Sequence, residues 1–427
     1  MKCYDYSSIG ERCYEERLDN GLLVRVVPKK DFARKYAFIA IDFGSIDTSF
    51  TVEQKRHRVP DGIAHYLEHK MFDLPDANAM NLFAAQGGSP NAFTSYAMTA
   101  YYFSCTENFD ENLRTLLTMV MTPHFTPESV EKERGIIAQE IKMYEDSADS
   151  RVYEDLFAAL YAEHPVRVPI SGTVESIGEI TAQTLYDCYD AFYQPSNMIL
   201  CVAGDVDAQQ VIAAARELTG STKAQIPERH YGKTESMLPV KKRTQRRMEV
   251  SMPSFSVGFK CEAPASGRET MLQEIIGDLA AEILIGESSP LYQRLYEDGL
   301  IDAGFSAGYE SVKEACMITA GGDSKDPDAV LSAMLAEADR IRAEGFDTEL
   351  FERLKKSSLG RRTRDLDSFE SICYRNCAYF FDGTDYFRFP EVFASVTKEA
   401  VQEFLCRVIR PERSAISMIL PKEQEVF

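Results

Sequence analysis

Two histidines and a glutamate near residue 65 have the types and the spacing of a metal centre. In the segment GIAHYLEHKMF, residues 62–72, His65 and His69 are four residues apart and Glu68 directly precedes the second histidine. Residues i and i+4 lie on one face of a helix, so both imidazoles could reach a single ion, with Glu68 beside it. Composition alone predicts only about 0.01 such matches in a chain of this length. The segment therefore predicts a metal site.

The order of these residues also indicates a kind of chemistry. H-x-x-E-H is the inverse of H-E-x-x-H and occurs in zinc hydrolases. A catalytic zinc has three protein ligands and one open position for water, whose pKa falls to about 7, so that a nearby carboxylate can take its proton. The alternative is a polar face of an amphipathic helix. Ile63, Leu67 and Phe72 lie in line with the two histidines, which predicts a partly buried helix and weakens that alternative.

A third ligand must come from another part of the chain. The helix predicted over 128–145 offers four carboxylates: Glu131, Glu133, Glu140 and Glu145. Glu133 and Glu140 are two turns apart on one face and flank the apolar pair Ile136 and Ile137. A carboxylate on a partly buried face is costly unless a cation or donor accompanies it. The spacing alone leaves the choice among these carboxylates open.

The remaining histidines and the cysteines fit a metal site less well. The other histidines lie in a polar run or in turn-like sequence: His57, His124, His164 and His230. The ten cysteines form no CxxC pair, and the nearest approach to one is Cys373 and Cys377, at a spacing that suits one helix face. In a reducing compartment we expect free, mostly buried thiols.

Composition excludes several classes of function. The chain has 427 residues, 44% of them apolar and 27% charged, as is typical of globular proteins. Its 67 acidic and 47 basic residues give a net charge of -20, which disfavours nucleic-acid binding. The sequence contains neither a signal-peptide core nor an apolar membrane span, which predicts a soluble, cytoplasmic protein without a membrane partner. Dinucleotide and phosphate-binding glycine motifs are also lacking.

The elements that must position the site alternate between strands and helices. The β-rich segments 21–29 and 36–44 are expected to form a hairpin. Helices are predicted over 61–72, 110–121, 128–145, 150–162 and 181–193, and strands over 100–106 and 198–207. Because strict βαβ alternation is missing, we predict an α+β fold with a mainly antiparallel sheet.

The polar segment 221–246 lacks periodicity and divides the chain nearly in half. After it a similar order of elements recurs: strands over 247–261, 315–322 and 414–421, with helices over 268–286, 328–344, 347–365 and 397–408. The sequence thus predicts an N-terminal metal-binding domain over 1–220, a linker over 221–246, and a structurally similar C-terminal domain over 247–427 without a metal motif.

The N-terminal half resembles the pitrilysin or insulinase family of zinc metallopeptidases, known as M16, and especially its small bacterial, processing-peptidase-like members. The resemblance is carried by LDNGLLV (18–24), FGSID (43–47), GIAHYLEHKMF (62–72), GGSPNAFTSYAMTAYYFSC (87–105), VEKERGIIAQE (130–140), HPVRVPISGTVESI (164–177) and FYQPSNMILCVAGDVD (192–207). This ordered series is much more specific than the five-residue motif alone.

The resemblance implies a role for each residue of the site. His65, His69 and Glu140 would bind zinc, Glu68 would be the catalytic base, and Glu133 would be a supporting carboxylate behind the ligands. Asn91 and Ala92 resemble residues that bind an extended peptide by adding it to a sheet edge. The implied fold is two similar α+β halves enclosing a chamber, and the implied activity is zinc-dependent cleavage of short or unfolded peptides.

The C-terminal half departs from the family pattern. Many members carry an Arg and a Tyr that contact the scissile carbonyl, whereas the matching positions here are Tyr296 and Asp302. The candidate substitutes are Arg294, Tyr292 and Tyr309. The alternative function is therefore a non-proteolytic or partner-dependent subunit, working as a homodimer or with a zinc-less M16 relative. Close bacterial relatives are also associated with elongation factor P modification.

Overall fold

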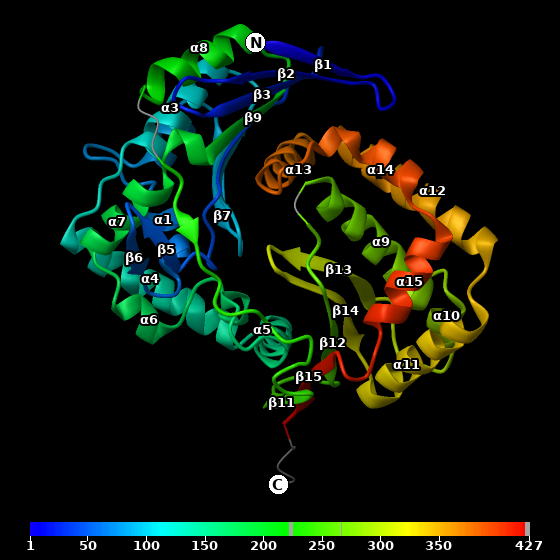
Figure 1. Cartoon of the computed structure of the whole chain (residues 1–427). Helices are drawn as coiled ribbons and strands as arrows, with labels where there is room; N and C mark the ends of the chain where they lie inside the picture. Colours follow the sequence, from blue (N-terminus) through cyan, green and yellow to red (C-terminus); the bar gives the residue numbers. More distant parts are fainter. Residues whose placement is uncertain (222–224, 266, 423–427) are drawn as a thin grey trace. The chain divides into compact units, whose positions relative to one another are not determined.

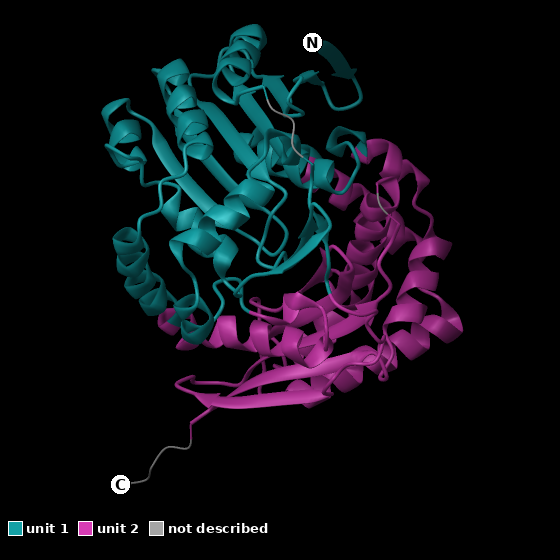
Figure 2. Ribbon diagram, turned by 60° about the vertical axis from the view of Figure 1, so that its left-hand side comes forward, with its two compact units in different colours: residues 1–141, 169–231, 363–388 teal, residues 142–168, 232–362, 389–427 magenta. Residues whose placement is uncertain are grey.

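The chain forms two compact units, each built from a sheet and its covering helices (Figure 2). The computed structural model describes residues 1–221, 225–265 and 267–422. Unit 1 comprises residues 1–141, 169–231 and 363–388, and unit 2 comprises residues 142–168, 232–362 and 389–427. This arrangement confirms the predicted α+β class with two sheet-and-helix halves.

Unit 1 contains a seven-stranded sheet (Figure 1). Its strands, in spatial order, are β1 (Lys2–Tyr6), β2 (Glu11–Arg17), β3 (Leu23–Pro28), β9 (Met198–Gly204), β4 (Lys35–Ile41), β8 (Thr99–Cys105) and β7 (Ser89–Thr94). Only β3 and β9 pair in parallel, with Leu23 opposite Ile199. The sheet is thus mainly antiparallel, as predicted, and β1 and β7 are its edge strands.

The predicted hairpin of residues 21–29 and 36–44 is wrong. β3 and β4 do not pair, because β9 lies between them and hydrogen-bonds to both. Every residue of β9 is buried, as expected for an apolar strand at the centre of a sheet. The short connection between β3 and β4 therefore crosses over a strand that comes from a distant part of the sequence.

Helices cover both faces of this sheet. They are α1 (Ile63–Lys70), α2 (Ala79–Ala85), α3 (Phe109–Met121), α4 (Pro127–Glu145), α6 (Val174–Gly178), α7 (Ala182–Phe192), α8 (Ala208–Leu218) and α13 (Phe369–Phe381). Ala37 and Ile39 of β4 belong to the core formed with α1 and α3. Arg25 of β3 points to the other face, where it donates to Asn376 of α13 at 3.3 Å.

A three-stranded sheet takes up part of the predicted linker. Its strands are β10 (Glu228–Arg229), β5 (Ser49–Val52) and β6 (Lys55–Arg58), and β10 pairs with β5. β11 (Arg243–Met248) also begins inside the segment 221–246, of which residues 222–224 lie outside the described residues. The polar composition of this segment therefore concealed two short strands.

Unit 2 repeats the central topology of unit 1. Its strands, in spatial order, are β11, β15 (Ser414–Pro421), β12 (Ser254–Cys261), β14 (Ala315–Asp323) and β13 (Ser306–Val312). Its helices are α5 (Ala148–Leu160), α9 (Arg268–Ile285), α10 (Pro290–Glu297), α11 (Pro327–Glu344), α12 (Thr348–Arg364), α14 (Phe389–Ser395) and α15 (Lys398–Val408). The order matches β3-β9-β4-β8-β7, and β11 and β15 form the parallel pair. The predicted similarity of the halves is thus visible in the topology.

Two segments group differently from a simple division of the sequence. Residues 142–168 belong to unit 2 because α5 packs on β12 and β15, and residues 363–388 belong to unit 1 because α13 packs on β4 and β9. Among the described residues no helix is long and apolar enough to cross a membrane. The ten cysteines are free, and eight of them are buried, as expected.

Candidate metal centre

Helices α1 and α4 of unit 1 hold the predicted metal ligands. α1 begins after Gly62, whose φ of 88° is left-handed and whose position leaves no room for a Cβ beside the Ser171 carbonyl. Ile63, Ala64 and Leu67 are fully buried, which fixes the helix against the core. Its Tyr66 hydroxyl donates a hydrogen bond to a carbonyl of α4, that of Val130. The two helices are thereby held together.

The structure brings His65, His69 and Glu140 together. Nε2 of His65 lies 3.6 Å from Oε1 of Glu140, and Nε2 of His69 lies 3.5 Å from Oε2 of Glu140. These distances are too long for good hydrogen bonds. They match the separation of about 3.4 Å between donors that surround one zinc ion tetrahedrally at about 2.1 Å. The three side chains therefore fit a zinc ion.

In the structure, the four carboxylates that could be the third ligand have different partners. Glu145 pairs with Arg151 at 2.9 Å, and Glu131 pairs with Arg134. Oε1 of Glu133 lies 3.0 Å from Nδ1 of His69. The geometry thus favours Glu140 over the other three carboxylates as the third ligand, and Glu133 contacts His69 at its other ring nitrogen.

Glu133 is placed to fix the orientation and tautomer of His69. A proton on Nδ1 of His69 can be donated to Glu133, which leaves the lone pair of Nε2 for a metal. Burial alone would lower the pKa of His69, but the hydrogen bond to Glu133 and the charges of Glu68, Glu133 and Glu140 raise it above its ordinary value. This concentration of negative charge favours a cation at the site.

Glu68 lies in the same helix with its carboxylate largely shielded from water. The residue is 9% exposed. Burial raises the pKa of Glu68, and a hydrogen bond from Thr94 together with the charges of His65 and His69 partly opposes that rise. Oγ1 of Thr94 donates to Oε2 of Glu68 at 2.7 Å. Thr94 is not among the predicted site residues, although its place two residues after Ala92 puts both on the same face of a strand.

Asn91 and Ala92 lie on β7, an edge strand of the sheet. Ala92 is opposite Tyr101 of β8 and packs against the core, whereas Asn91 is exposed. The Oδ1 atom of Asn91 accepts a hydrogen bond from the Ala92 amide at 2.9 Å. Peptide binding at this amide would require the Asn91 side chain to turn away.

Three of the four other histidines have structural surroundings. His57 stacks on Phe50 with ring centroids 5.3 Å apart, and His230 hydrogen-bonds Thr51 at 2.8 Å. Nδ1 of buried His164 accepts from the Val166 amide at 3.2 Å. Among the described residues, the only side-chain group with metal-binding geometry is His65, His69 and Glu140.

The residues at the altered positions of the C-terminal half, and their candidate substitutes, differ in exposure and in hydrogen bonding. Tyr296 is exposed and stacks on Tyr292, and Asp302 accepts from the Gly304 amide at 2.8 Å. Tyr309 is buried, and its hydroxyl accepts from Gln273 at 3.0 Å. Arg294 is exposed. The Tyr292 hydroxyl donates to the Asp302 carbonyl at 3.3 Å. Of the candidate substitutes, both tyrosines are thus already engaged within unit 2.

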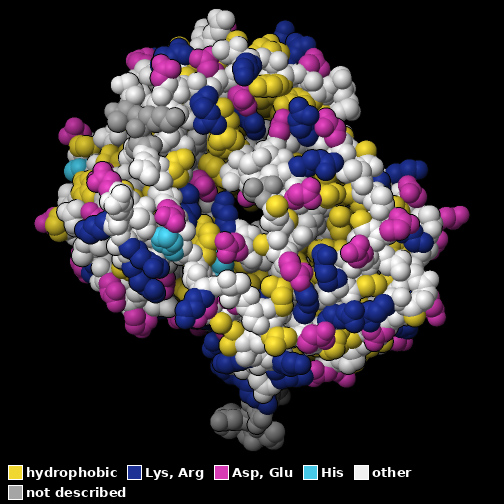
Figure 3. All heavy atoms as spheres, in the orientation of Figure 1, with side chains coloured by type: hydrophobic (Ala, Val, Ile, Leu, Met, Phe, Trp, Pro, Cys, Tyr) yellow, Lys and Arg dark blue, Asp and Glu magenta, His cyan; other side chains and the backbone are white. Residues whose placement is uncertain are grey.

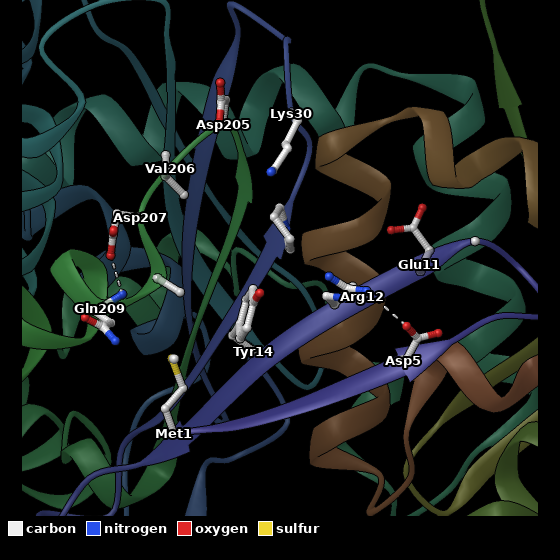
Figure 4. Close-up of a pocket in the computed structure, with 13 residues that line it drawn as sticks. Met1, Asp5, Glu11, Arg12, Tyr14, Lys30, Asp205, Val206, Asp207 and Gln209 are labelled. Atoms are coloured by element: carbon white, nitrogen blue, oxygen red, sulfur yellow. Dashed lines mark hydrogen bonds and ion pairs between the residues drawn. The ribbon is translucent and has the colours of Figure 1, made fainter.

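A cavity elsewhere in unit 1 does not belong to the metal group. It has a volume of about 700 Å³ and is lined by residues of β1, β2 and the start of α8 (Figure 4). Arg12 and Asp5 pair across its wall at 3.2 Å, and Asp207 accepts from the Gln209 amide at 2.7 Å. The charged side chains labelled in the figure include both acidic and basic residues, and Arg12 and Asp5 neutralise each other.

Comparison with known proteins places the chain among zinc-protease relatives. Residues 55–174 match the family model described as insulinase, peptidase family M16, and residues 179–358 match the peptidase M16 inactive domain. A Bacillus subtilis protein described as uncharacterized zinc protease YmfH is 38% identical over 99% of this chain and 100% of its own length. YmxG of the same organism, also described as an uncharacterized zinc protease, is 27% identical over 75% of this chain and 79% of its own.

Solved structures show the same fold. An M16-like peptidase from Alicyclobacillus acidocaldarius has a TM-score of 0.92 and 36% identity, covering 96% of this chain and 99% of its own. A Helicobacter pylori protease has a TM-score of 0.82 at 18% identity, covering 96% of this chain and 100% of its own, and it supports the fold alone. Because the Bacillus subtilis relative YmfH is 38% identical over 99% of this chain and 100% of its own length, the chain belongs to peptidase family M16.

Proposed function

We propose that this protein is a zinc-dependent endopeptidase that hydrolyses peptide bonds in short or unfolded peptides. The observation that carries the proposal is that Nε2 of His65 and Nε2 of His69 lie 3.6 Å and 3.5 Å from the two carboxylate oxygens of Glu140. The carboxylate of Glu68 comes from the same helix as the two histidines. A structural zinc needs no base beside it, because its coordination is closed.

Each residue has a task in this reaction. His65, His69 and Glu140 would hold the ion, and Glu133 would keep His69 in the binding tautomer. Bound zinc supplies polarisation of the scissile carbonyl and acidification of a water molecule. Glu68 accepts the proton of the attacking water and delivers it to the nitrogen of the leaving amine. The β7 edge at Asn91 and Ala92 would align the substrate backbone.

The experiment that tests this proposal combines zinc quantification with digestion of a mixed peptide library. We expect one zinc per chain and cleavage that stops when a chelator is added. The Glu68→Gln protein should retain its zinc but lose at least about 100-fold in kcat, because the general base is removed. Full activity in that variant would contradict the role of Glu68.

A second candidate function is suggested by Tyr296 and Asp302, which replace the Arg and Tyr of many family members. The protein could be one subunit of a pair, as a homodimer or with a zinc-less relative, in which the partner completes the wall opposite the zinc. Such a subunit could serve in peptide binding or assembly, including a link to elongation factor P modification. Library cleavage by the zinc-loaded chain alone would reject this function, and cleavage only after adding such a relative would support it.

We further propose that the protein acts in the cytoplasm. Its ten cysteines are all free, and free thiols are typical of reducing compartments.

A further inference from the structure

Thr94 is the last residue of β7 and pairs with Thr99 of β8. Its neighbours show which way its side chain faces. Phe93 points to the face of Phe38 and Tyr102, where its ring lies 6.0 Å and 6.2 Å from theirs. Because successive side chains on a strand alternate, Thr94 points to the opposite face, toward α1.

On that face Oγ1 of Thr94 donates to Oε2 of Glu68 at 2.7 Å. Among the described residues, this is the only side-chain hydrogen bond that the Glu68 carboxylate accepts. The bond occupies one carboxylate oxygen and leaves Oε1 for another proton donor. A threonine hydroxyl is also well suited to this place, because its β-branched side chain is restricted at χ1.

The base needs such a restraint. The last torsion of a glutamate is broad, so a carboxylate without a fixed partner rotates through many orientations. Proton transfer requires one oxygen within hydrogen-bond reach of the attacking water. Since β7 is held by its ladder with β8, a donor on β7 fixes the carboxylate relative to the sheet as well as to α1.

We propose that Thr94 is a positioning residue that orients the Glu68 carboxylate for proton transfer. This inference rests on the proposed peptidase function. It adds a residue of β7 to a proton transfer otherwise assigned to Glu68 alone. Thr94 itself contacts neither the ligand atoms of the metal group nor the substrate in this scheme, and it acts through Glu68.

The test compares Thr94→Val, which keeps the shape of the side chain and removes the hydroxyl, with Thr94→Ser, which keeps the hydroxyl. Both zinc-loaded proteins should hold one zinc per chain. We expect kcat of the Val variant to fall about 10–100-fold, the usual effect of removing a supporting hydrogen bond at a metal site. KM should stay within about 2-fold, and the Ser variant should recover to within about 3-fold of wild-type kcat.

Three results would overturn the role of Thr94. They are an unchanged kcat in the Val variant, an equal loss of kcat in the Ser variant, and a loss of bound zinc that parallels the loss of activity. Crystal structures of the zinc-loaded wild-type and Val proteins give a readout that needs no turnover. We expect the Glu68 carboxylate to rotate in the Val protein, and an unmoved carboxylate would overturn the inference. A wild-type protein that holds zinc but cleaves nothing would instead contradict the proposed function.

Discussion

At the scale of single residues, the choice of the third ligand gives a matched pair of variants. Glu140 faces both histidines. Glu145 lies five residues further along α4 and pairs instead with Arg151. We expect Glu140→Gln to weaken zinc binding by more than about 100-fold, because a ligand is lost rather than a supporting partner. Glu145→Gln should bind zinc like the wild-type protein. Isothermal titration with zinc after chelator treatment measures both affinities.

The reverse outcome, zinc lost from the Glu145 variant and kept by the Glu140 variant, would exchange their roles. A similar loss in both variants would indicate unfolding of α4 and not a change of ligand, and circular dichroism distinguishes that case.

The sequence revealed the two histidines and Glu68 because they lie within one helical turn, where spacing alone places side chains on one face. It narrowed the third ligand to four carboxylates but could not choose, since that choice depends on how α4 packs against α1. Only the family resemblance singled out Glu140. The sequence did not predict a role for Thr94, because its contact with Glu68 joins a strand to a helix 26 residues away. Local spacing does not report a contact of that kind.

At the scale of elements, an arginine joins the two helices of unit 2 that correspond to α1 and α4 of unit 1. α9 lies between β12 and β13 as α1 lies between β4 and β7, and α12 precedes β15 as α4 precedes β9. Nη2 of Arg362 on α12 lies 2.5 Å from Glu274 and 3.6 Å from Asp278, both on α9. A guanidinium thus joins these two helices through carboxylates.

This arrangement predicts that Arg362→Met destabilises unit 2. The side chain of Arg362 is 7% exposed, and its loss removes a cation that lies beside two carboxylates one helical turn apart. We expect a loss of about 1–3 kcal/mol, less than for a fully buried pair because both carboxylates are partly exposed. Urea unfolding measures the change. Arg361→Met is the matched control, because Arg361 is 45% exposed and pairs with Glu282, and equal losses in both variants would contradict the prediction.

The segment before the short helix Pro165–Arg167 of unit 2 predicts a pH dependence. Burial lowers the pKa of His164 to about 4, Glu235 opposes this and Lys260 adds to it. Because the folded pKa lies below the ordinary value of about 6.5, the neutral form is favoured by folding. The stability is therefore complete above about pH 6.5 and is lost as the pH falls toward 4.

His164→Asn keeps an acceptor for the Val166 amide and removes the titration. Between pH 7.5 and pH 5, the wild-type free energy of unfolding should fall by about 2 kcal/mol more than that of the variant. Urea titrations at the two pH values give this difference. Parallel pH profiles would show that His164 is not the titrating group.

At the scale of the whole molecule, local patterns located most long helices within a few residues but not the order of the strands. β9 enters the sheet between β3 and β4 from a segment about 170 residues away, and nothing in the two flanking strands encodes that insertion. α13 likewise lies within the predicted C-terminal domain of residues 247–427, yet it packs on the sheet of unit 1. Long-range pairing of this kind is set by burial, which local spacing does not report.

Charge at this scale gives little guidance to partners. Despite the net charge of -20, acidic and basic side chains are interspersed over the visible face (Figure 3). Many of them pair across elements within a unit, as Arg114 does with Glu217 at 2.9 Å. The acidity that matters for a metal ion is thus local, at Glu68, Glu133 and Glu140.

The confinement of the metal group to unit 1 predicts unequal stabilisation of the two units by zinc. A ligand that binds only the folded state adds about 2.7 kcal/mol when its concentration is 100 times the Kd. In scanning calorimetry, zinc should raise the unfolding temperature of the transition that contains unit 1, and a chelator should reverse the shift. The Glu140→Gln protein is the control and should show neither effect. Among the described residues no second group of side chains has the geometry to hold the ion, so a zinc-dependent shift that persists in this variant would contradict the prediction.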